Sequence, residues 1–191
     1  MKIIISTFTG IIGSAAAATI IGKRRNRFID RSTVRNFRAE EFAGVWYEIA
    51  RLDNAAERGL SHVSMTFNVD ADGSISLRTE GLRDGTASFE VTRGRVSVPD
   101  AARRASMKVS GMPFTDRELN VLEVDEEYNF ALVGRRSANN LRILSRAPYI
   151  PQEDLGYLVA RALERGYDIS NLVFPGHAAV VSACEALACA M

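Results

Sequence analysis

The sequence predicts a mainly-β domain: an up-and-down antiparallel barrel of eight strands, with one α-helix packed outside it and a short final strand. Three observations lead to this fold class. Short apolar runs alternate with polar residues at a period of two, Gly, Asp and Asn residues separate the runs, and the helical stretch comes after them. A meander of this kind has exposed edges unless it closes on itself, so a closed barrel is the expected architecture.

The alternating runs follow one another closely along the chain. They lie at residues 62–69, 75–78, 89–92, 95–98, 106–110, 118–124, 129–134 and 141–146. In the first run Val63, Met65 and Phe67 alternate with polar residues, which predicts a strand with one apolar face and one solvated face. The segment from Asp70 to Ser74 predicts a hairpin turn to the next run.

The predicted helix spans residues 151–165. A proline stands at its start, acidic residues lie in its first turn and arginines near its end, as the helix dipole favours. Gly166 ends it. Its apolar stripe, which predicts packing on the outside of the sheet, consists of Leu155, Leu158, Val159, Ala162 and Leu163. Residues 167–174 are expected to form the last strand.

The charges are unevenly distributed. The net charge of +1 gives no indication of nucleic-acid binding, but residues 1–38 hold eight basic and one acidic side chain, whereas the remainder holds 16 basic and 22 acidic ones. Together with the patterns above, this charge distribution divides the chain into four predicted parts. They are a signal peptide or membrane anchor at 1–22, a basic linker at 23–36, the barrel and its helix at 37–174, and an alanine-rich tail at 175–191.

The N-terminal segment is expected to direct the chain to a membrane. Residues 3–22 are uncharged and mostly apolar, and Lys2 with the small residues at 14–18 fits a secretory signal, although an uncleaved anchor or a helix of a cytosolic protein also fits. The basic cluster at 23–27 favours the cytoplasmic side or an anionic lipid surface. We expect an exported, periplasmic or membrane-associated protein. An outer-membrane location stays open, but there is no cysteine near the apolar run that could carry a lipid.

Three motifs in order resemble the lipocalin family, and in particular its bacterial outer-membrane and apolipoprotein D-like group. They are Gly-Val-Trp-Tyr-Glu-Ile-Ala-Arg at 44–51, Tyr-Asn-Phe-Ala-Leu-Val at 128–133 and Ile-Leu-Ser-Arg-Ala-Pro at 143–148. The resemblance covers about residues 37–174 and implies a ligand inside the barrel. It also implies that Trp46 packs at the closed end under Arg146, with Gly44 and Tyr128 as further structural residues of the motifs.

Strict alternation then predicts the interior of this barrel. If Trp46 faces inward, Glu48 and Ala50 do so too, unless a bulge intervenes; if Arg146 faces inward, so do Leu144 and Arg142. The expected ligand-binding residues are the two charged ones, Glu48 and Arg142, and apolar walls formed by Val63, Met65, Phe67, Leu77, Phe89, Val91, Met107 and Val109.

Arg142 has three possible environments. It pairs with the phosphate or carboxylate of a bound lipid, pairs internally with Glu48, or faces solvent. Leu141 and Ile143 would then face outward, beneath the helix.

These residues predict a carrier that binds, stores or transports a fatty acid or lysophospholipid and so supports membrane maintenance. No nucleophile lies beside a base, no cofactor is expected, and Cys184, Cys189 and His177 are too few for a zinc site. Two alternatives remain: an isomerase or de-epoxidase that uses Glu48 as a base, and a membrane-associated scaffold with a filled barrel. We expect a monomer or weak dimer, attached to the membrane through its N-terminal segment, that does not bind nucleic acid.

Overall fold

The computed structural model describes residues 28–55, 57–72, 74–86, 88–112 and 118–176. The predicted leader, residues 23–27 of the basic linker and residues 177–191 of the tail, with its two cysteines, lie outside the described residues. The strands are β1 (Gly44–Leu52), β2 (Leu60–Val69), β3 (Ile75–Arg83), β4 (Phe89–Ser97), β5 (Ser106–Ser110), β6 (Glu118–Val124), β7 (Phe130–Gly134), β8 (Leu141–Ser145) and β9 (Leu172–Val173). The helices are α1 (Ala39–Phe42) and α2 (Gln152–Glu164), with a 3-10 turn at Ile169–Asn171.

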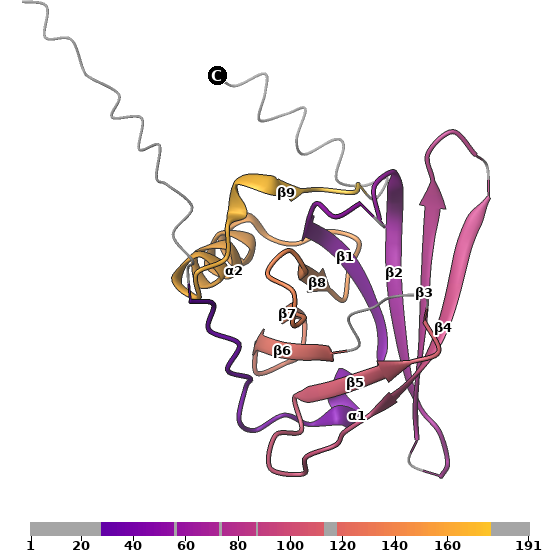
Figure 1. Ribbon diagram of the computed structural model, residues 1–191, viewed down its shortest axis with the longest axis vertical. Helices are drawn as coiled ribbons and strands as arrows, with labels where there is room; N and C mark the ends of the chain where they lie inside the picture. Colours follow the sequence, from indigo (N-terminus) through magenta and orange to yellow (C-terminus); the bar gives the residue numbers. More distant parts are fainter. Residues whose placement is uncertain (1–27, 56, 73, 87, 113–117, 177–191) are drawn as a thin grey trace, which may run out of the picture.

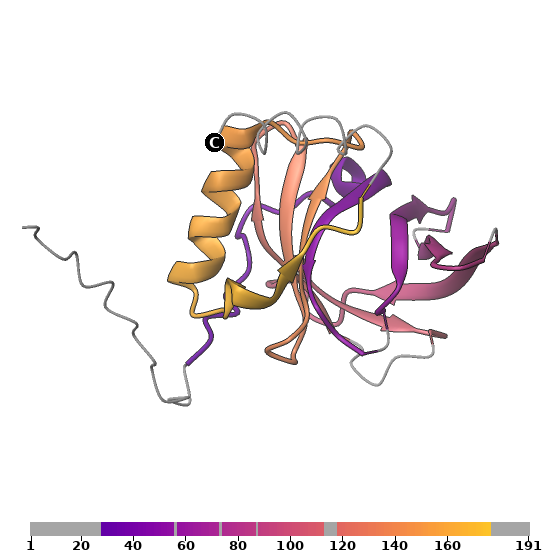
Figure 2. The same ribbon diagram turned by 90° about the horizontal axis from the view of Figure 1, so that it is seen from above.

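The predicted barrel is confirmed. Each of β1 to β8 pairs antiparallel with the next, and β1 pairs with both β2 and β8, so the sheet closes. In Figures 1 and 2, α2 lies on one side of this barrel and the β3–β4 hairpin lies on the opposite side. The short β9 is bonded to the outer end of β1, where Arg51 pairs with Val173.

Three strands differ clearly from the sequence prediction. The run at 75–78 continues to Arg83 in β3. The runs at 89–92 and 95–98 belong to one strand, β4, because Arg93 and Gly94 continue the ladder opposite Arg78 and Leu77. The last strand is only two residues long, since residues 169–171 form a 3-10 turn before it. The sequence prediction made this strand too long, because the sequence does not show that only Arg51 and Leu52 of β1 pair with it.

Two apolar clusters hold the domain together. One fills the interior of the barrel around Trp46, Met65, Leu77 and Met107. The other lies outside the barrel, between α2 and the strands β1, β6, β7 and β8.

The helix stripe lies over this second cluster as predicted, except at one end. Leu158 and Ala162 are buried, and Leu155 and Val159 pack beside them. Leu163 is 49% exposed, so its assignment to the stripe was wrong. Its side chain lies about 100° around the helix from that of Ala162, beyond the edge of the covered face.

Alternation holds along β8 but fails in β1. Leu141 and Ile143 pack beneath α2, while Leu144 lies in the barrel interior, as predicted. A bulge between Glu48 and Ala50 shifts the register of β1 against β8. Ala50 therefore packs under α2, and its predicted inward orientation is wrong.

The described end of the basic linker is bound to the barrel. The Asp30 amide donates to the Arg165 carbonyl at 2.9 Å, and the Val34 amide donates to the Val121 carbonyl at 3.1 Å. Arg165, 8% exposed, also donates to the carbonyls of Ser32 and Leu122, each at 2.9 Å. This segment thus ties β6 to the end of α2.

Among the described residues, none of the helices has the length and apolar character needed to cross a membrane.

Tyr167 offers a test of packing in the outer cluster. Its buried hydroxyl has no hydrogen-bond partner among the described residues, and burial raises the pKa of its phenol above the ordinary 10.0. Removing an unsatisfied hydroxyl removes a desolvation cost, so Tyr167→Phe should raise the free energy of unfolding by ~1 kcal/mol.

The pH dependence of the Tyr167→Phe effect follows from the direction of the pKa shift. The neutral phenol favours the folded state below the unfolded pKa, and this contribution is lost as pH rises through the raised folded pKa. The stability advantage of Tyr167→Phe should therefore widen from about pH 10 upward in denaturation curves measured at several pH values. An equal advantage at all alkaline pH values would contradict this assignment.

Candidate functional site

The closed end of the barrel is built around Trp46 and Arg146. The Trp46 side chain is fully buried, and its indole nitrogen donates to the Phe42 carbonyl at 2.8 Å. The Arg146 guanidinium carbon lies 3.9 Å from the centroid of the indole ring, which confirms the stacking that the resemblance implied. Arg146 also donates to the carbonyls of Val45 at 3.0 Å and Tyr128 at 3.1 Å, so it joins three segments at this end.

Gly44 and Tyr128 shape the same end. Gly44 has a φ of +100°, and a Cβ placed there would lie 3.1 Å from Nη1 of Arg146. Only glycine combines this backbone conformation with such a close approach. The Tyr128 hydroxyl accepts a hydrogen bond from the Arg38 amide at 2.9 Å and so holds the segment that leads into α1. These contacts hold the fold and lie away from the open end.

Six of the eight predicted wall residues are buried in the barrel. They are Val63, Met65, Phe67, Leu77, Met107 and Val109. The other two, Phe89 and Val91, are 61% and 37% exposed, and their placement in the wall was wrong.

The register of β3 against β4 explains this error. Leu77 faces the interior opposite Gly94, so Thr79 and Gly81 face it opposite Thr92 and Glu90. The intervening residues of β4, Phe89 and Val91, must then point outward. The alternation at 89–92 was correct, but the inward phase of this run was assigned to the wrong set of residues.

Near the open end, four charged side chains form a buried cluster. Nη1 of Arg142 donates to Oε2 of Glu48, and its Nη2 donates to Oε1 of Glu57. Nη1 of Arg51 donates to the other Glu48 oxygen at 2.6 Å. Arg142 is thus paired internally, and the alternative in which it faces solvent is wrong. We call Glu48, Arg51, Glu57 and Arg142 the buried ion cluster.

The ion cluster is neutral as a whole, which makes its burial possible. Two carboxylates and two guanidinium groups are each less than 10% exposed. Burial lowers the pKa of Arg142 to about 10, so this side chain still carries its charge at neutral pH. Burial also lowers the pKa of Arg51, although nearby Glu57 opposes the shift.

Sequence reasoning missed half of this cluster. Arg51 belongs to the first motif, but only the bulge in β1 turns it inward opposite Arg142. Glu57 comes from the loop between β1 and β2, where Nη2 of Arg51 holds the carbonyls of Glu57 and Leu60 at 2.8 and 2.9 Å. The loop sequence Glu-Arg-Gly-Leu at 57–60 is charged, but no local pattern indicates that Glu57 reaches into the barrel.

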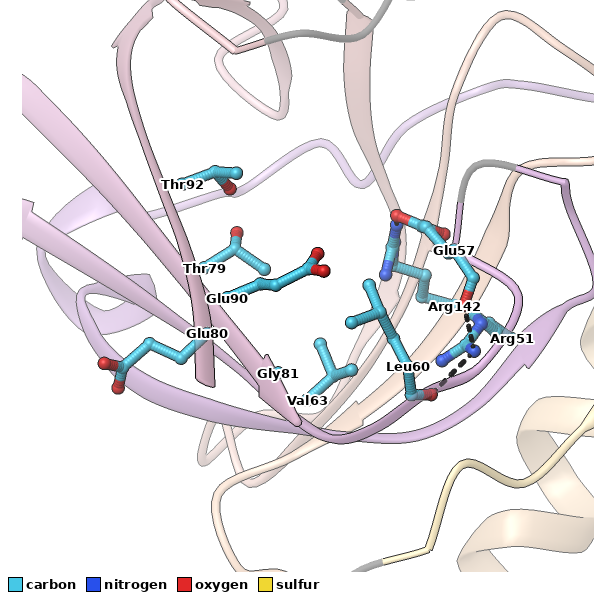
Figure 3. A pocket seen from close by; sticks show the side chains of 10 residues that line it. All are labelled: Arg51, Glu57, Leu60, Val63, Thr79, Glu80, Gly81, Glu90, Thr92 and Arg142. Carbon is cyan, nitrogen blue, oxygen red and sulfur yellow. Dashed lines mark hydrogen bonds and ion pairs between the residues drawn. The ribbon is translucent and has the colours of Figure 1, made fainter. Parts of the chain in front are cut away.

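A cavity of about 120 Å³ lies beside the ion cluster at the open end. It is lined by Arg51, Glu57, Leu60, Val63, Thr79, Glu80, Gly81, Glu90, Thr92 and Arg142. In Figure 3, Glu90 extends toward the cavity while Glu80 points away from it. The lining thus combines apolar side chains and threonines with a pair of guanidinium groups and with the carboxylates of Glu57 and Glu90.

No group of three or more potential metal-binding side chains occurs among the residues described above.

Comparison with known proteins is consistent with this architecture. The profile of the lipocalin-like domain matches residues 37–177. The chain is 34% identical to the outer membrane lipoprotein Blc of Escherichia coli over 75% of its own length and 81% of that protein. It is 24% identical to apolipoprotein D of Mus musculus over 72% of this chain and 75% of that one.

Solved structures give the same answer for the fold. Insecticyanin from the tobacco hornworm Manduca sexta superposes with a TM-score of 0.64 at 19% identity, over 78% of this chain and 85% of that one. The domain match, the identity to the bacterial lipoprotein and the closed barrel together show that the chain belongs to the lipocalin family.

Proposed function

We propose that this lipocalin binds and carries a single-chain amphipathic lipid, a fatty acid or a lysophospholipid, with its acyl chain in the barrel and its anionic group at Arg142. The observation that carries the proposal is the cavity at the open end, which two buried guanidinium groups line together with the apolar side chains of Leu60 and Val63. A closed eight-stranded barrel is wide enough to hold one small ligand, as in other lipocalins.

The acyl chain needs more room than the cavity offers at rest. Its volume of about 120 Å³ is below the ~300–1,000 Å³ of common ligand pockets. Met65 pairs with the cavity-lining Thr79, and Met107 lies in the same buried cluster. Methionine side chains adopt new rotamers at low cost, so we infer that the acyl chain of the lipid enters the barrel by displacing the side chains of Met65 and Met107.

The anionic group is proposed to replace Glu57. This carboxylate comes from a loop and is held by Arg142 and by the Asn54 amide, whose Nδ2 lies 2.5 Å from Oε2. Glu48, by contrast, is on β1 and has both oxygens bonded to guanidinium groups. A ligand carboxylate or phosphate that displaces Glu57 would keep the Arg142 charge paired.

The test compares one lipid with and without its charge. Glu57→Gln weakens the internal competitor for Arg142, so it should tighten binding of a long-chain fatty acid roughly tenfold, ~1.4 kcal/mol. The fatty alcohol of the same length should bind as it does to the wild type. The measurement is isothermal titration of the full chain with each lipid.

Glu90→Gln is the matched control, because Glu90 lines the same cavity but pairs with Arg83 at 2.7 Å. It should leave the ratio of the two affinities unchanged. Equal tightening of acid and alcohol by Glu57→Gln would overturn the placement of the anionic group, and failure of both lipids to bind the wild type would overturn the carrier function.

The two alternatives have less support. A general base needs a free carboxylate oxygen, and both oxygens of Glu48 accept guanidinium hydrogen bonds. A scaffold was expected to have a filled barrel, whereas a cavity lies at the open end.

We further propose that the chain is exported to the cell envelope, where it supplies or removes such lipids and so helps to maintain the membrane. Relatives that carry the name outer membrane lipoprotein support this location. Fractionation of cells that express the chain with and without residues 1–22 tests it. A full-length chain found entirely in the cytoplasmic fraction would contradict export.

A further inference from the structure

The β3–β4 hairpin lies on the side of the barrel opposite α2 (Figure 2), and its outer face carries apolar and basic side chains. Its register places Leu82 beside Phe89, Glu80 beside Val91, and Arg78 beside Arg93. We call Leu82, Phe89, Val91, Arg78, Arg93 and Arg95 the outer strip.

The apolar part of the outer strip is unusually exposed for strand residues. Phe89 is 61% exposed and Val91 37%, although both are large apolar side chains. They stand near the open end of the barrel, where β4 begins. The next residues along the same strand, Glu90 and Thr92, face the cavity. The outer strip and the proposed lipid site are therefore two faces of one strand.

The basic part of the outer strip contrasts with the rest of the domain. Residues 39–191 hold 16 basic and 22 acidic side chains, so the domain is acidic overall. The outer strip holds three arginines, and one of them, Arg78, pairs with the neighbouring Glu80. Arg93 is exposed and forms no ion pair among the described residues. A local excess of positive charge thus lies next to the exposed apolar residues, further along β4.

We propose that the outer strip docks the barrel onto the surface of an anionic lipid bilayer. Phe89 and Val91 would enter the boundary between head groups and acyl chains, and Arg93 and Arg95 would contact lipid phosphates. From Phe89 to Arg95 the strand extends over ~20 Å, long enough for both contacts at once. The inference rests on the proposed function in one respect, because docking here brings the open end of the barrel close to its lipid source.

Bromolipid quenching of a tryptophan on the outer strip provides the test. Phe89→Trp in the full chain should be quenched by vesicles of phosphatidylglycerol and brominated phosphatidylcholine, and much less by vesicles of brominated phosphatidylcholine alone. The chain's single native tryptophan, Trp46, is fully buried at the closed end and supplies a constant background.

Tyr157→Trp is the matched control. Tyr157 lies on α2 and is 52% exposed, so its substitution gives a surface tryptophan on the opposite side of the barrel. Because the readout reports position, binding of the basic N-terminal segment to the same vesicles does not imitate the result. Quenching of Tyr157→Trp as strong as that of Phe89→Trp, or no quenching at position 89, would overturn the proposal.

Charge reversal tests the basic part. Adding Arg93→Glu to Phe89→Trp should raise the lipid concentration for half-maximal quenching about tenfold or more. An unchanged concentration would overturn the contact with anionic lipid.

A second copy of the chain is the competing occupant. If Phe89→Ser turned a dimer into a monomer in sedimentation while position 89 stayed unquenched, the outer strip would be a dimer interface and the proposal would be wrong. Lipid affinity in solution should be unchanged in Phe89→Ser, so failure of docking and failure of the carrier function are distinguishable.

Discussion

Replacing Arg142 with methionine is expected to lower the free energy of unfolding by about 3 kcal/mol. The substitution keeps an unbranched side chain of similar length in the barrel but removes the charge between two buried carboxylates. Glu48 keeps its bond from Arg51, whereas Glu57 keeps only the Asn54 amide. The loss comes from a buried negative charge that has lost its counter-charge.

The Arg142 prediction can be checked by urea unfolding followed through the fluorescence of Trp46, the single tryptophan. Arg136→Ala is the control, since this arginine is exposed and its loss should change stability by no more than ~0.5 kcal/mol. Adding Glu57→Gln to Arg142→Met should recover much of the loss because it removes the unpaired charge. A loss of stability for Arg142→Met as small as that for Arg136→Ala would show that Arg142 does not neutralise buried carboxylates in the folded protein.

Replacing Trp46 with alanine is expected to cost about 3–5 kcal/mol. The fully buried indole touches Phe42, with ring centroids 4.8 Å apart, and lies under Arg146. Its removal opens a cavity, leaves the Phe42 carbonyl without its donor and removes the ring on which Arg146 stacks. All three losses fall where the closed end joins β1 to the segment before it.

Circular dichroism must follow the unfolding of the Trp46 variant, since the chain has no other tryptophan. Trp46→Phe should be intermediate, because it keeps an aromatic ring under Arg146 but loses the hydrogen bond. Tyr157→Ala, at a half-exposed position on α2, should change stability little. If Trp46→Ala unfolded at the wild-type urea concentration, the closed end would not be part of the cooperative core.

The sequence alone determined the barrel, the external helix and the closed end. Alternation with a period of two identifies strands because each strand of a closed barrel has one interior and one exterior face. Leu141 and Ile143 could be placed under the helix for this reason, and the Trp46 and Arg146 contact followed from the family motifs.

The phase of β4 was not determined by the sequence. Its apolar residues change parity along the strand: Phe89 and Val91 occupy one set of alternate positions and Val96 occupies the other. Only pairing with β3 decides which set faces inward, and it selects Val96.

The ion cluster depended even more on tertiary structure. A bulge of one residue in β1 moved Ala50 under the helix and turned Arg51 inward. Glu57 reaches Arg142 from 85 positions away along the chain. Local patterns record which residues share a face, but bulges, strand register and loop paths are set by the packing of segments distant in sequence. For this reason the sequence identified the barrel and its closed end, whereas only the tertiary structure decided which charges meet at its mouth.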